Sequence, residues 1–142
     1  MATLTRSQAN LLLQDGVTLD VSEAATILTL LERQFEAAVR HRSAELTALA
    51  DELTPLLDAM EARRQQRVQL VRALLGPQGT MAQYSATLAP AARAAFDAAW
   101  TALEQTVRAC QQATHRNGQL LAEQHSVMQR VLHGDEQLYA PR

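Results

Sequence analysis

The sequence has no lysine, one cysteine and few aromatic residues, and each shortage narrows what the protein can be. With Cys110 alone, the chain can form neither an intramolecular disulfide nor a cysteine-based zinc site. Aromatic residues make up 4% of the chain, so the core must be built from aliphatic side chains and alanine. Glycine and proline, at five and four residues, are too scarce for the many turns of a sandwich or a barrel.

An excess of charge of one sign and a long apolar run are also missing. Thirteen arginines face fifteen acidic residues, which gives a net charge of −2 and no general attraction for nucleic acid or anionic lipid. No uninterrupted apolar stretch reaches the roughly 18 residues of a membrane span, and the run Leu11–Leu13 is too short for a signal peptide. We therefore expect a cytoplasmic protein with no nucleic-acid partner and no membrane insertion.

Helix-forming residues dominate what is present. Alanine (26) and leucine (22) make up a third of the 142 residues, and this balance favours helix over strand. We expect residues 1–142 to form a single all-α domain. Its predicted architecture is an elongated antiparallel up-and-down bundle of three long helices with coiled-coil-like packing, preceded by a possible short N-terminal helix.

The first half of the chain offers only weak helix boundaries. A short helix is predicted from Thr5 to Gln14, closed by Asp15-Gly16, and the first long helix follows from Asp20 or Ser22. The segment His41–Ser43 either separates the first two long helices or marks a kink within one continuous helix. The apolar stripe predicted for the first long helix is Val21, Ala25, Leu28, Leu31, Phe35 and Val39.

Stronger signals divide the second half. Pro55 either kinks the second long helix or lies in its first turn, and Gly76 ends that helix. Residues 78–87 form a connector, and the last helix starts near Pro90. Gly134 is predicted to end it, which leaves residues 134–142 as a short tail.

A heptad seam follows the last helix, which should lie nearly antiparallel to its partner. Its positions are Phe96, Trp100, Leu103, Val107, Cys110, Thr114, Asn117, Leu121, Gln124, Met128 and Val131. Three interpretations of the polar stretch within it stay open: a register signal, the end of the intramolecular partner, or drift of the seam onto Leu120, Val127 and Leu132. The expected core is Leu28, Leu31, Phe35, Leu46, Leu53, Leu57, Leu103, Val107 and Leu121.

No arrangement of residues indicates catalysis, a metal or a cofactor. The four histidines (41, 115, 125 and 133) lack the i, i+4 spacing of a helical zinc site, and no Glu-x-x-His pair or phosphate-binding loop is present. Cys110 lies on the apolar seam, as expected for a packed thiol. The basic cluster Arg63, Arg64, Arg67 and Arg72 is either a solvated helix end or a docking patch for an acidic partner. We therefore expect a protein that works by contact and is not an enzyme.

Two segments resemble the FlgN-type flagellar export chaperones. The first is His115–Gln124, with its Asn-Gly-x-Leu-Leu core at residues 117–121, followed in the tail by Leu138-Tyr139. The second is Leu56–Arg64, which resembles the family's second long helix and closes at Leu74-Leu75-Gly76. In the tail motif this chain has Ala140 where the family usually has glycine.

The resemblance implies a chaperone of flagellar type III export. Such a protein would bind the C-terminal helical regions of hook-associated (hook–filament junction) proteins, prevent their premature assembly and deliver them to the export gate. The implied gate contacts are Leu138 and Tyr139. The implied client-binding residues are Asn117, Gly118, Leu120, Leu121, Gln124, Val127, Met128 and Val131.

Two other functions compete with this one. The long helix would also suit an adaptor coiled coil that oligomerises, for example as a homodimer, without chaperone activity. A four-helix-bundle enzyme or metal carrier is the third possibility, although the residues give it no support.

Overall fold

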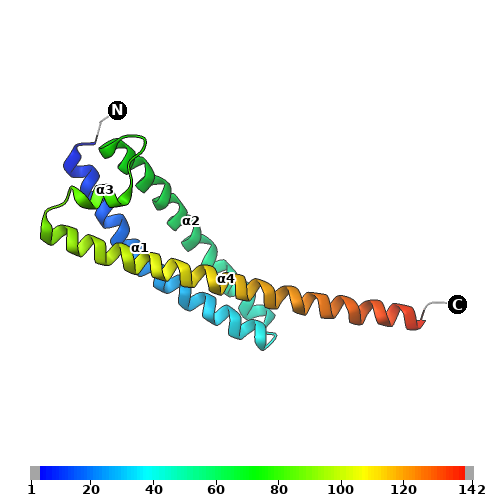
Figure 1. Ribbon diagram of the computed structural model, residues 1–142. Coiled ribbons are helices and arrows are strands. Elements are labelled where there is room, and N and C mark those ends of the chain that lie inside the picture. Colours follow the sequence, from blue (N-terminus) through cyan, green and yellow to red (C-terminus); the bar gives the residue numbers. More distant parts are fainter. Residues whose placement is uncertain (1–3, 140–142) are drawn as a thin grey trace.

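The computed structural model describes residues 4–139 of the chain, with side chains described for residues 4–133. Its elements are the helices α1 (Arg6–Val39), α2 (Ser43–Leu75), α3 (Met81–Ala86) and α4 (Pro90–Tyr139). Helices α1 and α2 form an antiparallel hairpin, α3 lies at one end of it, and α4 runs along α1 and projects beyond it (Figure 1). No strand occurs within the described range, so the predicted all-α bundle of three long helices is confirmed.

Helix α1 runs unbroken through Gly16, where a helix end was predicted. Leu13 and Val17, one turn apart on either side of this glycine, are both fully buried. Their burial outweighs the roughly 1 kcal/mol that glycine costs inside a helix, so the chain does not break here. The predicted short N-terminal helix is therefore the first part of α1.

The chain reverses between α1 and α2 at His41, whose φ of 55° lies in the left-handed region. The boundary near Ser43 is thus a true break, and Ser43 is the first residue of α2, with Arg42 at the cap position. Pro55 lies in the interior of α2, which continues to Leu75. Gly76 ends α2 with a φ of 92°, as predicted from the sequence.

Helix α3 lies within residues 78–87, for which a connector and no helix was predicted. Thr80 and Gln83 form a capping box at its start, with the Thr80 hydroxyl accepting from the Gln83 N–H at 3.1 Å. Thr5 and Gln8 form the same box at the start of α1. The Thr-x-x-Gln spacing is a recognised helix-start signature, so the sequence did contain the signal.

Aromatic residues join α3 to the start of α4. Tyr84 is fully buried, and its ring meets Phe96 edge-on with centroids 5.2 Å apart. The Tyr84 hydroxyl accepts a hydrogen bond of 3.2 Å from the Gln14 side chain on α1. Phe96 in turn stacks with Trp100 at 6.4 Å. Helix α3 and the start of α4 therefore close one end of the bundle with three of the five aromatic residues of the chain.

The rest of the core is aliphatic and forms two clusters that follow one another along α1. One cluster surrounds Leu13, Val17 and Leu103, and the other surrounds Ile27, Leu31 and Leu53. Of the expected core, Leu31, Leu53 and Leu103 are buried, whereas Leu28, Phe35, Leu46 and Val107 are partly buried.

Two expected core residues are exposed. Leu57 is 48% exposed and Leu121 is 37% exposed, so both predictions were wrong. Leu57 lies on the side of α2 that faces α4, where the two helices do not pack together. The stripe of α1 was also misplaced by about one residue, because Ala24 is buried while Ala25 and Val39 are exposed.

Helix α4 differs from the prediction in two respects: the direction of the helix it packs against and the residue at which it ends. Its main partner is α1, which runs parallel to it, because α2 returns the chain to the end of the bundle where α1 begins, and α4 starts from there. The helix also continues through Gly134 to Tyr139, so the predicted stop at Gly134 was wrong. A 50-residue helix is about 75 Å long, whereas the 34 residues of α1 span about 51 Å.

Candidate functional site

Three polar side chains of α4 fix its register on α1. They lie one heptad apart, and each donates to a backbone carbonyl of α1 that is also one heptad from the next. The pairs are Cys110 Sγ to Ala24 O at 3.6 Å, Asn117 Nδ2 to Leu31 O at 2.8 Å and Gln124 Nε2 to Ala38 O at 2.9 Å. A constant offset over two heptads shows that the helices keep one register along this length.

Asn117 explains the polar interruption of the seam. Its side chain is buried, donates also to Gln34 Oε1 at 2.8 Å, and accepts from the Arg116 guanidinium at 3.1 Å. Arg116 also covers the Phe35 ring at 4.0 Å from its centroid. A fully bonded buried amide on a helix seam is the arrangement expected of a register signal.

Cys110 belongs to the same interface. Burial raises the pKa of its thiol, and its Sγ atom faces the Ala24 carbonyl. These surroundings disfavour the thiolate and are those of a packed cysteine.

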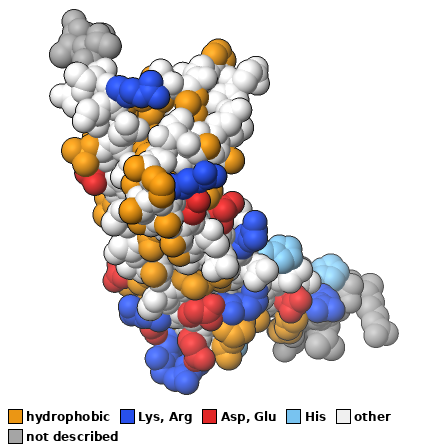
Figure 2. Space-filling view, turned by 60° about the vertical axis from the view of Figure 1, so that its left-hand side comes forward, with side chains coloured by type: hydrophobic (Ala, Val, Ile, Leu, Met, Phe, Trp, Pro, Cys, Tyr) orange, Lys and Arg blue, Asp and Glu red, His pale blue; other side chains and the backbone are white. Residues whose placement is uncertain are grey.

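The intramolecular partner of α4 ends at Gln124. Beyond it, every described residue from 125 to 133 is exposed, and α4 projects from the body as an arm (Figures 1 and 2). The seam does not drift onto a covered face, because Val127 and Leu132 are exposed along with Met128 and Val131. We call the apolar side chains that begin just before Gln124 and continue along the arm the distal stripe: Leu120, Leu121, Val127, Met128, Val131 and Leu132.

The predicted client residues fall into two groups. Asn117 and Gln124 are bonded to α1, and Leu120 is partly buried next to them. Gly118 is exposed next to Asn117, before the arm begins, with open space around its Cα. The other four, Leu121, Val127, Met128 and Val131, are exposed and belong to the distal stripe.

The predicted gate contacts lie at the end of α4. Leu138 and Tyr139 belong to its last turn rather than to a tail after it. Their side chains lie outside the described residues, as does Ala140.

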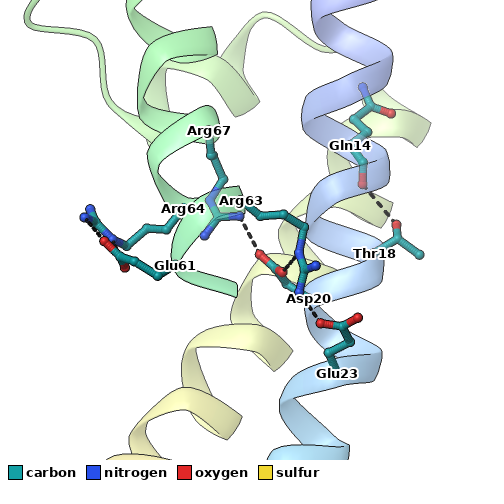
Figure 3. A network of polar contacts seen from close by, with 8 residues as sticks. All are labelled: Gln14, Thr18, Asp20, Glu23, Glu61, Arg63, Arg64 and Arg67. Atoms are coloured by element: carbon teal, nitrogen blue, oxygen red, sulfur yellow. Dashed lines mark hydrogen bonds and ion pairs between the residues drawn. The ribbon is translucent and has the colours of Figure 1, made fainter. Parts of the chain in front are cut away.

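The arginine cluster of α2 divides into two parts, because Arg63 and Arg67 are turned to α1 whereas Arg64 and Arg72 are exposed. The fully buried Asp20 carboxylate of α1 accepts from Arg63 Nε at 2.5 Å and from Arg67 Nη1 at 2.6 Å (Figure 3). Arg63 also pairs with Glu23, one turn further along α1. Burial lowers the pKa of Arg63, but the two carboxylates raise it by more, so the guanidinium stays charged. Arg63 and Arg67 thus tie α2 to α1. The charged Asp20, within the apolar stripe of α1, was the sequence signal for this contact.

Other kinds of site find no support within the described part of the chain. No group of three His, Cys, Asp or Glu side chains there is placed to hold a metal ion. None of the helices, as far as they are described, has the length and apolar character needed to cross a bilayer.

Comparison with known families identifies the chain. The family model described as FlgN protein matches residues 13–133, which covers most of the chain and the whole of the α1–α4 interface. No curated protein and no solved structure gives a significant match. The chain therefore belongs to the FlgN family of flagellar export chaperones.

Proposed function

We propose that this chaperone binds the C-terminal helical regions of hook-associated proteins, keeps them from assembling and delivers them to the export gate. The observation that carries the proposal is the distal stripe on the arm of α4. Val127, Met128 and Val131 are each more than half exposed, although Met128 and Val131 continue the seam that α1 covers elsewhere and Val127 lies beside it.

The chemistry of the stripe suits an amphipathic helix. Apolar residues spaced three or four apart form one face of a helix, and a client helix can cover that face with a matching stripe of its own. The proposed contacts are Leu120, Leu121, Val127, Met128 and Val131, with Asn117, Gly118 and Gln124 at the inner end where α1 stops. Holding the client needs no chemistry, because binding alone lowers the concentration of free, assembly-competent client.

Two aspartates on the stripe test this proposal. Val127→Asp combined with Val131→Asp places two charges where the client helix would lie, and we expect at least a hundredfold loss of affinity for a hook-associated protein fragment. The matched control carries Ser126→Asp and Gln129→Asp, which add the same charge to the opposite, exposed face of the arm. Far-UV circular dichroism should stay helical for both. Unchanged client affinity in the stripe variant would refute the proposed site.

Delivery is proposed to involve Leu138 and Tyr139, next to the stripe on the same helix. Tyr139→Ala should leave client affinity and melting temperature nearly unchanged while it weakens binding to the cytoplasmic domain of the export gate. A fall in melting temperature of several degrees with intact gate binding would make Tyr139 a packing residue instead.

The same stripe also supports the competing adaptor function, because a second copy of the chain could cover it. Light scattering with and without a client fragment separates the two. A stable homodimer that ignores the fragment would favour the adaptor, whereas a one-to-one complex with the fragment would favour the chaperone.

A further inference from the structure

A second apolar surface lies between α2 and α4, away from the arm. Both helices pack on α1, yet no described Cα atom of α2 comes within 8 Å of one of α4. The space between them is a groove of about 560 Å³ with α3 at one end. Its apolar lining, which we call the α2–α4 groove, is Leu57, Met60, Val68, Val71, Pro77, Met81, Trp100, Leu103 and Val107.

The groove has the length of a helix. Its α2 wall runs from Leu57 to Arg72, which corresponds to about 22 Å or four helical turns. Two methionines, Met60 and Met81, line it, and their flexible side chains can adapt to the surface of a partner. Hydrophobic side chains run down one face of the body with charged groups beside them (Figure 2).

Arginines predominate on the α2 side of the groove, where Arg64 is paired with Glu61, and Glu104 lies on the α4 side. On the α2 side Arg67 is already bound to Asp20 and lies 5.4 Å from the centroid of the Trp100 ring. Arg72, on the same side, has no ion-pair partner among the described residues, and neither has Glu104 on the α4 side. A helix that fits these borders carries an acidic group on the edge facing Arg72 and a basic group on the edge facing Glu104.

The groove and the distal stripe belong to one seam of α4. Trp100, Leu103 and Val107 of the seam line the groove, and Met128 and Val131 of the same seam are exposed on the arm. Helix α1 packs on the seam beside the groove, where Leu103 joins the cluster of Leu13 and Val17, and around Asn117, but leaves the seam uncovered on the arm. A client with two amphipathic helices can therefore follow a single helix of the chaperone from the groove to the arm.

We propose that the α2–α4 groove binds a second amphipathic helix of the client, with an acidic edge toward Arg72 and a basic edge toward Glu104. The proposal rests on the proposed function. It adds a second contact that completes a four-helix arrangement around α1, α2 and α4, because the incoming helix fills the place where α2 and α4 fail to meet.

The protein carries its own reporter for this site. Trp100 is the single tryptophan of the chain and lines the groove. It lies about 30 Å along α4 from Leu120, so a helix bound to the arm alone leaves its surroundings unchanged. The probe is the C-terminal helical fragment of a hook-associated protein with its tryptophans replaced by phenylalanine. Binding to the unmodified chaperone should shift Trp100 emission to shorter wavelength, because the client helix excludes water from the ring.

Two variants and one control complete the test. Leu57→Asp at the exposed border and Arg72→Glu should each weaken fragment binding at least tenfold, and Leu57→Asp should remove the emission shift. Leu19→Asp is the control, because Leu19 is 46% exposed on α1 and does not line the groove. All three should keep the helical circular dichroism of the parent.

The outcomes separate this inference from the proposed function. Fragment binding without an emission shift, and with full affinity in both groove variants, overturns the groove proposal and leaves the arm as the client site. An emission shift that persists in the Val127→Asp, Val131→Asp variant supports a separate groove contact. No binding of any client fragment refutes the proposed function and the groove proposal together. If the chaperone without client is a dimer and Leu57→Asp converts it to a monomer, the groove binds a second copy of the chain. That result overturns the groove proposal.

Discussion

The side-chain amide of Asn117 donates a hydrogen bond of 2.8 Å to the backbone carbonyl of Leu31, a group that lies in the interior of helix α1. A carbonyl oxygen has two lone pairs, so it can accept this bond in addition to the one within its own helix. A shift of α4 by one turn would break this bond together with that of Asn117 to Gln34 and those of Cys110 and Gln124 to α1. The bond therefore selects one register for two parallel helices that are otherwise mostly apolar.

Asn117→Ala tests this role. We expect the free energy of unfolding to fall by about 1–3 kcal/mol, because the Leu31, Gln34 and Arg116 partners of the amide are lost together. Gly118→Ala is the control at the next residue, which is exposed and has no atom within 4 Å of an added Cβ. It should raise stability by about 0.5–1 kcal/mol. Urea unfolding measures both, and a neutral Asn117→Ala would show that packing alone sets the register.

Replacing Asp20 should lower the free energy of unfolding more than any other substitution proposed here. Asp20→Ala leaves Arg67 without its carboxylate and Arg63 with Glu23 alone, in surroundings that are largely closed to water. We expect a loss of about 3–5 kcal/mol, as for a buried ion pair with one partner removed. Asp15→Ala, at an exposed position of the same helix, should change stability by no more than about 0.5 kcal/mol. Equal effects of the two changes would contradict the structural role of the network.

Gly16→Ala should stabilise the protein. No atom outside the local backbone lies within 4 Å of an added Cβ, and alanine favours the helix by about 1 kcal/mol over glycine. Gly79→Ala should act in the opposite direction, because its Cβ would lie 2.8 Å from the Leu75 Cβ. Thermal unfolding should show the first variant melting above the parent and the second below it.

Glu61 should titrate at unusually low pH. It accepts hydrogen bonds from Arg64 at 2.8 and 2.7 Å and from Gln65 at 3.2 Å, and these lower the pKa of the carboxyl to about 2 from 4.5. The folded pKa is below the ordinary value, so any stability that the pair contributes is present at neutral pH. That contribution disappears as the pH falls from about 4.5 toward about 2.

NMR titration of the Glu61 carboxyl carbon measures this pKa directly. Arg64→Gln should return the midpoint toward 4.5, since Arg64 is the largest cause of the shift. High salt should do the same in the parent, because the pair is exposed and its charges are screened. A midpoint near 4.5 in the parent at low salt would show that the pair does not persist in solution.

Local helix signals in the sequence were sufficient to predict the all-α class, the three long helices and some of their boundaries. Gly76 and Pro90 marked real helix boundaries because of their own backbone properties. Gly76 adopts the positive φ that ends α2, and Pro90 fits the first turn of α4. Gly16 and Gly134 are also glycines, but neither ends a helix, because α1 continues through Gly16 and α4 through Gly134. What a glycine does depends on whether neighbouring turns are packed, and that information lies elsewhere in the chain.

The relation between helices was the part that one sequence could not supply. The seam of α4 predicted which residues face a partner, but Ala113 rather than Thr114 is buried, and the partner proved to be the parallel helix α1. A heptad pattern records which face is covered and is silent about the direction of the covering helix. For the same reason Leu57 was placed in the core, although α2 and α4 never pack at that level.

Gln124 divides α4 into two segments of unequal thermodynamic character. On the α1 side, opening an amide to hydrogen exchange must break interhelical contacts, so protection there approaches that of global unfolding. From residue 125 to 133 only the local helical bonds resist, and a short isolated helix is marginal in water. A partner that binds there must order a fraying helix, which lowers its net affinity. Binding to this segment is therefore readily reversed.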